Sequence, residues 1–218
     1  MFQLEKEMIP ILKRDLPKIF GSTHIAEEFV SGNGRPDLVF ACASSKRSFW
    51  KQTPPNYQTL HILVKYLNKE GRVLHIDKIL SVDIQNRKKI QAILDTLSKE
   101  GYIEYQDKNH LIVRRIYQPI IEEFISIEAK LSDWKSGVYQ AVRYKTFSNS
   151  SYLAISEESL DRVDRSFLRL NGIGLITVSG SSANIIMYPR KNKPKSIISH
   201  YYLSEQLVNS NSEIKNNS

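Results

Sequence analysis

The hydrophobic pattern of this chain changes near Trp50 and again near Pro119, and these two changes limit the folds that it can adopt. Before the first change and after the second, short runs of alternating apolar residues are interspersed with helical stretches. Between them, a Gln-Thr-Pro-Pro-Asn sequence at 52–56 opens a segment in which helical periodicity replaces alternation. The pattern therefore predicts one domain made of residues 1–49 and 117–208, with a second domain, residues 50–116, inserted into it.

The outer segments alternate helices with strands, which is typical of an α/β fold with a mixed central sheet flanked by helices. Met8, Leu12 and Leu16 begin an apolar helical stripe that Gly21 ends. The expected helices are 3–20, 135–147 and 160–170, and the expected strands are 24–30, 37–43, 125–130, 151–156, 173–178 and 184–188. Residues 209–218 are mainly Asn and Ser, so we expect a disordered tail.

The inserted segment is expected to form three helices and then a two-stranded ribbon. The helices are predicted at 57–68, 76–81 and 86–98, and the strands at 102–105 and 111–115. This order resembles a winged helix-turn-helix module, and the sequence from Ile93 to Ile103 is typical of its third helix running into the wing. The resemblance implies that the insert binds DNA.

The charge of the chain agrees with a polyanionic partner. The whole sequence has a formal net charge of +8, and residues 51–116 alone hold 12 Lys and Arg against 7 Asp and Glu. Basic character is therefore concentrated in the insert, as in many nucleic-acid-binding modules.

The outer segments carry two short motifs in a characteristic order. Pro36-Asp37 opens one expected strand, and Glu128-Ala129-Lys130 ends another. With the surrounding helices and strands, these motifs resemble the PD-(D/E)xK nuclease superfamily, which includes many restriction endonucleases. The resemblance covers residues 1–49 and 117–190 and implies a restriction-endonuclease-like central sheet. Asp37 and Glu128 lie 91 positions apart, farther than is usual in that superfamily, and the inserted domain accounts for most of the gap.

The resemblance also implies a set of roles. Asp37, Glu128 and the Ala129 carbonyl would hold Mg²⁺, with Mn²⁺ as an alternative, for the hydrolysis of a phosphodiester bond. Lys130 lies two residues beyond Glu128, so both side chains leave the strand on the same face. The Lys130 ammonium can therefore meet the carboxylates and the scissile phosphate.

Two helices add further candidates for the catalytic site. At 100° per residue, Glu5 falls within the apolar stripe of the first helix, whereas Glu7 points to the opposite face. A carboxylate on a packed face needs a partner or a metal, so we expect Glu5 to join the site. Gln140 and Tyr144 are one helical turn apart and could contact active-site water or DNA. The alternative for both is a polar edge on an otherwise packed helix.

Seven basic residues are candidates for DNA contacts. Arg87, Lys88 and Lys89 begin the third inserted helix, from which recognition helices reach the major groove. The other candidates are Arg114 and Arg115 on the expected wing, and Arg35 and Arg143 in the outer segments. For each of them an ordinary solvated charge is the alternative, and winged helices also serve protein contacts.

Together these features predict a Mg²⁺-dependent DNA endonuclease, with restriction or phage defence suggested by the family alone. Two alternatives remain open: a non-catalytic DNA-binding regulator on a nuclease-like scaffold, and a structure-selective or RNA-processing nuclease. We expect a cytoplasmic protein without a membrane segment, because no apolar run approaches the ~18 residues that a span needs and no signal sequence is recognisable. The duplex substrate would favour a homodimer if both strands are cut.

Overall fold

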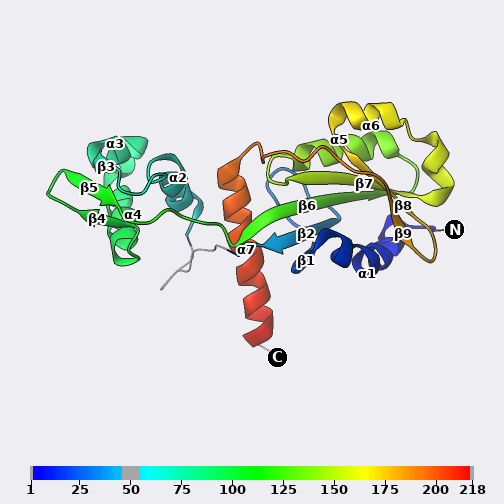
Figure 1. Cartoon of the computed structure of the whole chain (residues 1–218), viewed down its shortest axis with the longest axis horizontal. Coiled ribbons are helices and arrows are strands. Elements are labelled where there is room, and N and C mark those ends of the chain that lie inside the picture. The colour runs from blue at the N-terminus through cyan, green and yellow to red at the C-terminus, as the bar shows by residue number, and fades with distance from the viewer. Residues whose placement is uncertain (1, 46–54, 217–218) are drawn as a thin grey trace.

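The computed structural model of the chain describes residues 2–45 and 55–216. The larger body is built on a six-stranded sheet, and a smaller body holds α2, α3, α4 and a second sheet (Figure 1). Helix α7 lies between the two bodies (Figure 1). In the part of the chain that the structure describes, no helix is both long and apolar enough to cross a membrane.

The large sheet is mixed, as the alternation of helices and strands predicts. Its strands lie in the order β1-β2-β6-β7-β8-β9, with β6, β7 and β8 parallel and the remaining neighbours antiparallel. The bounds are β1 His24–Glu27, β2 Leu38–Ala43, β6 Ile121–Lys130, β7 Ser150–Ser156, β8 Gly174–Val178 and β9 Ala183–Met187. The predicted α/β fold with a mixed sheet and flanking helices is confirmed.

Helices cover both faces of this sheet. On one face lies α1 (Ile9–Phe20), preceded by the 3-10 helix η1 (Glu5–Glu7), and its buried Met8, Leu12 and Leu16 pack beneath β2 and β6. On the other face lie α5 (Trp134–Tyr144), the 3-10 helix η3 (Glu157–Arg162) and α6 (Arg165–Asn171). The sheet is therefore the middle layer of three, and its central strands β6, β7 and β8 are largely buried.

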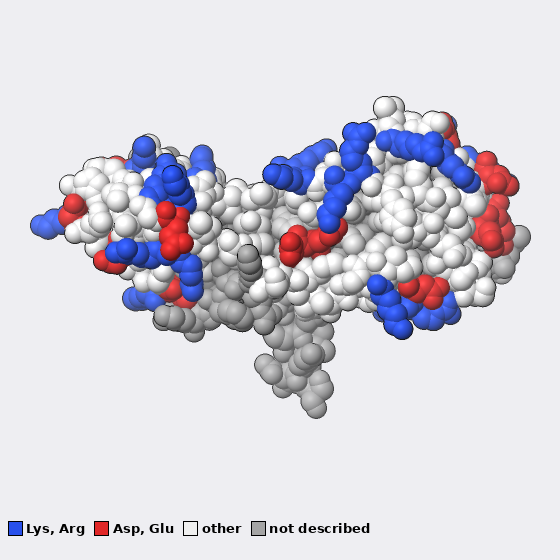
Figure 2. Space-filling view, viewed as in Figure 1, with Lys and Arg blue, Asp and Glu red and all other residues white. Residues whose placement is uncertain are grey.

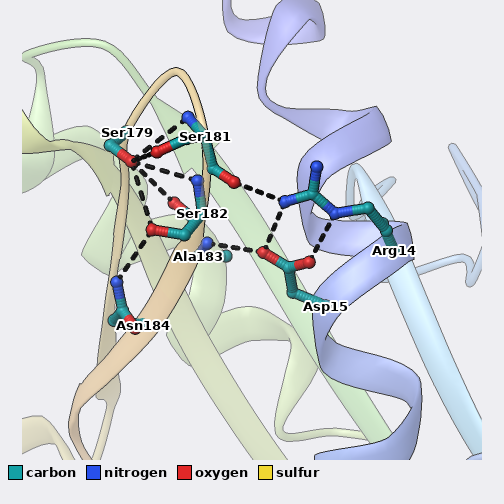
Figure 3. A network of polar contacts seen from close by, with 7 residues as sticks. All are labelled: Arg14, Asp15, Ser179, Ser181, Ser182, Ala183 and Asn184. Carbon is teal, nitrogen blue, oxygen red and sulfur yellow. Dashed lines mark hydrogen bonds and ion pairs between the residues drawn. The ribbon is translucent and has the colours of Figure 1, made fainter.

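A polar network ties α1 to the opposite edge of the sheet. The Asp15 carboxylate accepts hydrogen bonds from the Arg14 guanidinium and from the Ala183 amide at 2.8 Å, and Arg14 also donates to the Ser181 carbonyl at 2.6 Å (Figure 3). Within the β8–β9 turn, the Ser179 hydroxyl donates to the Ser182 carbonyl and accepts a hydrogen bond from the Ser182 amide (Figure 3). These contacts fasten α1 to the β8–β9 turn, although the contacting residues lie about 170 positions apart in sequence.

The inserted segment has its own core and its own sheet. Its elements are α2 (Tyr57–Lys65), β3 (Val73–His75), α3 (Asp77–Leu80), η2 (Ser81–Asn86), α4 (Arg87–Lys99), β4 (Ile103–Tyr105) and β5 (His110–Val113). The strands lie in the order β3-β5-β4. Strand β3 is absent from the sequence-based prediction because only its central residue, Leu74, is buried, which leaves too short an alternation to recognise.

The insert interrupts a connection between two neighbouring strands. Strands β2 and β6 pair antiparallel, with Leu38 opposite Ile127, although the whole insert lies between them in sequence. A long excursion between adjacent strands is tolerated because each doubling of a loop costs only about 0.6 kcal/mol. The motifs on β2 and β6 are therefore brought together despite their separation.

The C-terminal region differs from expectation. The sequence pattern predicts no element after residue 188 and a disordered tail at 209–218, but helix α7 runs from Ile197 to Asn216. Leu203 and Leu207 anchor it in the core beside Phe124 and Phe147. Once a helix is nucleated, each further residue adds a backbone hydrogen bond, so the polar sequence extends it through residue 216. Composition alone does not reveal this helix, and residues 217–218 lie outside the described part.

Helix α7 also contacts the insert and the segment that leads out of it. Tyr202 meets Tyr57 of α2 edge to face, with ring centroids 5.7 Å apart. The Tyr117 hydroxyl donates to the buried Glu205 carboxylate. Helix α7 thus packs against both bodies.

Substituting Gly174 should destabilise the sheet. A Cβ at this position would lie 2.4 Å from the Tyr152 ring and 2.9 Å from the Met187 carbonyl oxygen. Gly174→Ala should therefore cost about 1–3 kcal/mol of unfolding free energy, as overpacked sites do. Gly180→Ala is the matched control, because a Cβ there meets nothing within 4 Å. Urea denaturation measures both, and equal stabilities would refute the close packing of β7, β8 and β9.

Candidate active site

Asp37 and Glu128 face each other across two paired strands. The register that puts Leu38 opposite Ile127 places Asp37, just before β2, beside Glu128 near the end of β6. The Ala129 amide donates to Asp37 Oδ2 at 2.7 Å, which fixes the Asp37 carboxylate against β6. The predicted pairing of these two motifs at one end of adjacent strands is what the structure contains.

Lys130 links two carboxylates. Its Nζ lies 2.7 Å from Glu128 Oε1 and 3.3 Å from Glu5 Oε2. The side chains of Glu128 and Lys130 are 3% and 13% exposed, whereas that of Glu5 is 42% exposed. The ammonium is therefore held between a buried carboxylate and one that faces solvent. Glu5 does point towards this cluster, but it lies in the 3-10 helix η1 before α1 and not on the continuous α-helix 3–20 for which its phase was predicted.

Tyr144 holds the other oxygen of Glu128. Its hydroxyl lies 2.6 Å from Glu128 Oε2 and within 3.2 Å of the Arg35 carbonyl oxygen. The ring is buried, and it lies against Gly34, where a Cβ would come within 2.9 Å of it. Gly34 has a φ of +118°, a backbone conformation that other residues rarely adopt. The loop before Asp37 can therefore close over Tyr144 only with glycine at this position.

Gly137 lets α5 approach the site closely. A Cβ on Gly137 would lie 2.6 Å from Leu153 Cδ1 and 2.9 Å from Lys130 Cγ. The helix consequently rests directly on the stem of Lys130. Gly137 is absent from the predicted site residues, although a glycine inside a strongly helical stretch is a sequence signal for such close packing.

A pocket opens beside the carboxylates. It has a volume of about 390 Å³ and is lined by the start of α1 and the β1–β2 hairpin, including Glu5, Glu28 and Asp37. The lining also contains Lys6 and Lys13, and Lys13 is paired with Glu27. Three of its four carboxylates are also paired, Glu5 with Lys130, Glu27 with Lys13 and Glu28 with Arg35, which leaves Asp37 as the lining carboxylate without an ion pair in the described structure.

Burial dominates the electrostatics of the cluster. It raises the pKa of Asp37, and the Ala129 hydrogen bond and the Lys130 charge offset this only partly. Burial likewise raises the pKa of Glu128, against the hydrogen bonds from Lys130 and Tyr144. For Lys130, burial acts to lower the pKa, but the Glu128 hydrogen bond and the surrounding carboxylates outweigh it and raise the pKa. Lys130 is thus a cation at neutral pH.

The donor set is compatible with Mg²⁺. Two carboxylates with raised pKa values and a nearby backbone carbonyl at Ala129 are hard oxygen donors, and a divalent ion would relieve the cost of their burial. Across residues 2–45 and 55–216, no group of three or more His, Cys, Asp and Glu side chains is placed to hold a metal. A Mg²⁺ ion here would therefore depend on the Asp37 and Glu128 pair, the carbonyl and water.

Gln140 does not share the contacts of Tyr144. It lines a separate shallow depression on α5 with Tyr139 and Arg143, and its Oε1 is buried without a hydrogen-bond partner in the described structure. The hydrogen bond to Glu128 comes from Tyr144 instead, whose longer side chain reaches β6. The structure thus brings only the second of these two candidates to the cluster.

Arg35 lies beside the site but is already engaged. Its guanidinium pairs with the Glu28 carboxylate, and its Nε donates to the Glu28 carbonyl at 3.0 Å. Glu28 has a φ of 48°, the one left-handed non-glycine residue in the described chain. Arg143 is exposed on α5. Both arginines remain candidates for phosphate contacts.

The basic residues at the start of α4 differ in whether they form an ion pair. Arg87 pairs with Asp77 at 2.7 Å, whereas Lys88 and Lys89 are exposed and have no ion pair in the described structure. On the expected wing, Arg114 pairs with Glu104 at 2.8 Å. The two lysines are therefore the basic side chains of this group that are most available to a ligand.

Arg115 packs against the ring of Tyr102. Its guanidinium carbon lies 4.1 Å from the centroid of the Tyr102 ring, and it donates to the Glu100 carbonyl at 3.1 Å. Its Nε is buried. Arg115 follows the last strand of the insert and is half-buried against Tyr102, so less of its guanidinium is open to a ligand than on the exposed lysines of α4; its DNA contact stays a prediction.

The comparisons with known proteins add little to this geometry. No protein family and no curated protein matches the sequence. Among solved structures, the chain is similar to the SPO1766 protein of unknown function from Silicibacter pomeroyi, with 12% identity over 98% of this chain and 90% of that one and a TM-score of 0.48. The function must therefore be inferred from the site itself.

The pKa shifts predict how Asp37 affects stability. Asp37→Asn should raise the free energy of unfolding near neutral pH, because the folded state disfavours the ionised carboxylate. The gain should develop as the pH rises from the unfolded-state pKa of about 3.9 through the higher folded-state pKa, and it should vanish below the unfolded value. Urea denaturation across this pH range measures it.

Asp15→Asn is the control with the opposite sign. Hydrogen bonds from Arg14 and the Ala183 amide lower the pKa of Asp15. This variant should lose stability at neutral pH, and the loss should disappear as the pH falls through the lowered folded-state pKa. If Asp37→Asn instead loses stability at neutral pH, burial does not govern the Asp37 carboxylate.

Proposed function

We propose that this protein is a Mg²⁺-dependent DNA endonuclease on a restriction-endonuclease-like core. The observation that carries the proposal is the contact of Lys130 with both Glu128 and Glu5, on the strand that pairs with Asp37. All four groups lie in one cluster at one end of β2 and β6, and perturbed pKa values are found preferentially at functional sites. The order of these residues matches the PD-(D/E)xK pattern.

Each side chain has a distinct task in this proposal. Asp37, Glu128 and the Ala129 carbonyl would hold Mg²⁺, which when bound supplies Lewis-acid polarisation of the phosphate and acidifies water. Lys130, kept charged by its neighbours, offsets negative charge on the phosphate; it is already protonated at neutral pH, so it does not act as a general base. Glu5 and Tyr144 orient Lys130 and Glu128, respectively.

We further propose that the insert is a winged helix that binds the duplex. Three helices support this, with β3 between the first and the second and the β4–β5 hairpin after the third, which puts α4 in the position of a recognition helix. The exposed Lys88 and Lys89 lie in its first turn. Contacts from this turn would position the duplex, while cleavage takes place on the larger body.

One observation favours the alternative of a non-catalytic DNA-binding protein. Both oxygens of Glu128 already have partners, in Lys130 and Tyr144, without any metal. A scaffold that had lost its chemistry could keep such a closed polar cluster for specificity of folding. The cleavage experiment below separates the two functions.

The catalytic proposal predicts separate effects on cleavage and binding. Asp37→Ala and Lys130→Ala should each reduce Mg²⁺-dependent cleavage of supercoiled DNA by roughly 10²–10³-fold, as removal of one preorganised electrostatic group does. DNA affinity should change little, because the free lysines of the insert lie elsewhere. Agarose-gel assays with Mg²⁺, Mn²⁺ or EDTA measure cleavage, and Asp161→Ala, an exposed acidic residue of η3, is the control. Wild-type protein that binds DNA without cutting any form of it would support the alternative.

The binding proposal predicts a salt effect of the α4 lysines. Lys88→Ala and Lys89→Ala should each reduce the slope of log affinity against log salt by about 0.9, because each removes one phosphate contact. Lys18→Ala, which removes an exposed lysine from α1, should leave the slope unchanged. Fluorescence anisotropy with labelled duplex DNA at several salt concentrations gives the slopes. Unchanged slopes for both α4 variants would assign this turn to a protein partner or to solvent.

A further inference from the structure

Three basic side chains converge at the ends of α5 and α6, away from the carboxylate cluster. Lys145 directly follows α5, while Arg190 and Lys195 belong to the segment between β9 and α7. The Lys195 amide donates to the Lys145 carbonyl at 3.1 Å, so this segment runs alongside the end of α5. We call Lys145, Arg190 and Lys195 the basic corner.

The end of α6 brings two of these side chains together. Gly172 ends α6 with a φ of +66°, and a Cβ there would lie 3.0 Å from Lys145 Nζ and 3.3 Å from Arg190 Cβ. Lys145 Nζ also donates to the Asn171 carbonyl at 2.9 Å. The ammonium is therefore held in a defined position beside Arg190 and is not a freely moving surface charge.

The basic corner has no counter-charge of its own. Arg190 and Lys195 are exposed, and in residues 2–45 and 55–216 none of the three forms an ion pair with a carboxylate. The neighbouring Lys191, by contrast, pairs with Glu123 at 2.6 Å. Burial, followed by the charges of Lys195 and Arg190, lowers the pKa of Lys145. The three cations therefore repel one another, and a bound anion would relieve the repulsion.

We propose that the basic corner binds phosphates of the nucleic-acid backbone, and so extends the substrate contact beyond the catalytic cluster. This inference rests on the proposed function, because it takes the polyanion to be the substrate DNA. Basic groups without carboxylate partners, one of them fixed in place, are groups of the kind that contact the phosphates of a nucleic-acid backbone.

The position of the corner along α5 suits a backbone that passes the active site. Lys145 directly follows Tyr144, whose hydroxyl contacts Glu128, so the basic corner begins one residue beyond a side chain of the carboxylate cluster. On the face drawn in Figure 2, Lys and Arg side chains gather over the upper part of the larger body, including the side towards the insert.

Arg190→Ala and Lys195→Ala are the informative variants, because neither side chain makes a described structural contact that its loss would break. Lys145 is left intact, since it also caps α6 through Asn171. Fluorescein-labelled duplex DNA in EDTA, titrated at several salt concentrations, reports binding without cleavage. Each single variant should reduce the salt slope by about 0.9 and the double variant by about 1.8, whereas Lys18→Ala should leave it unchanged.

The outcomes separate this inference from the proposed function. If wild type binds DNA and the double variant retains the full salt slope, the basic corner is not a phosphate site, although DNA binding by the insert stands. If the DNA slope is unchanged but binding to polyglutamate is lost in the double variant, the corner serves an acidic protein, which also overturns the inference. If wild type does not bind DNA at all, the proposed function fails and the inference fails with it.

Discussion

The ion pair between Lys130 and the buried Glu128 is the interaction on which the rest of the site depends. Taking two charges out of water is costly, so the pair persists only where further groups complete it. Tyr144 satisfies the second oxygen of Glu128, Glu5 shares the ammonium, and Ala129 anchors Asp37 beside them. Each of these groups comes from a different element, so the cluster exists only when η1, β2, β6 and α5 are all in place.

The same requirement explains where the chain tolerates an insertion. The connection between β2 and β6 leaves the sheet at the end of β2 and returns at the start of β6, which is the end of this strand pair opposite to Asp37 and Glu128. A domain placed there lengthens a loop without entering the space around the carboxylates. Helix α7 then packs against both bodies through Leu203, Tyr202 and Glu205, which restricts how far the insert can move from the core.

The spacing of apolar residues along the sequence predicted much of the architecture. The strands of the large sheet, α5 and the helices of the insert follow from apolar periodicity, and their observed ends lie within a few residues of the expected ones; the helix expected over 3–20 is instead divided into η1 and α1. Helix α7 was not predicted, although seven of its first twelve residues, 197–208, are apolar or aromatic and Leu203 and Leu207 are buried; the Asn- and Ser-rich residues after 208 drew the prediction towards a tail. Strand β3 was missed for another reason, since its hydrogen-bond partner β5 lies more than 30 residues away.

By itself, the sequence determined that Glu128 and Lys130 share a face, because strand side chains alternate. Only the tertiary structure decided which distant groups complete the cluster. Tyr144 reaches Glu128 because Gly137 and Gly34 let α5 and the loop come close, and Arg115 turns inward onto Tyr102. Such contacts depend on the separation and angle of packed elements, which local periodicity does not encode.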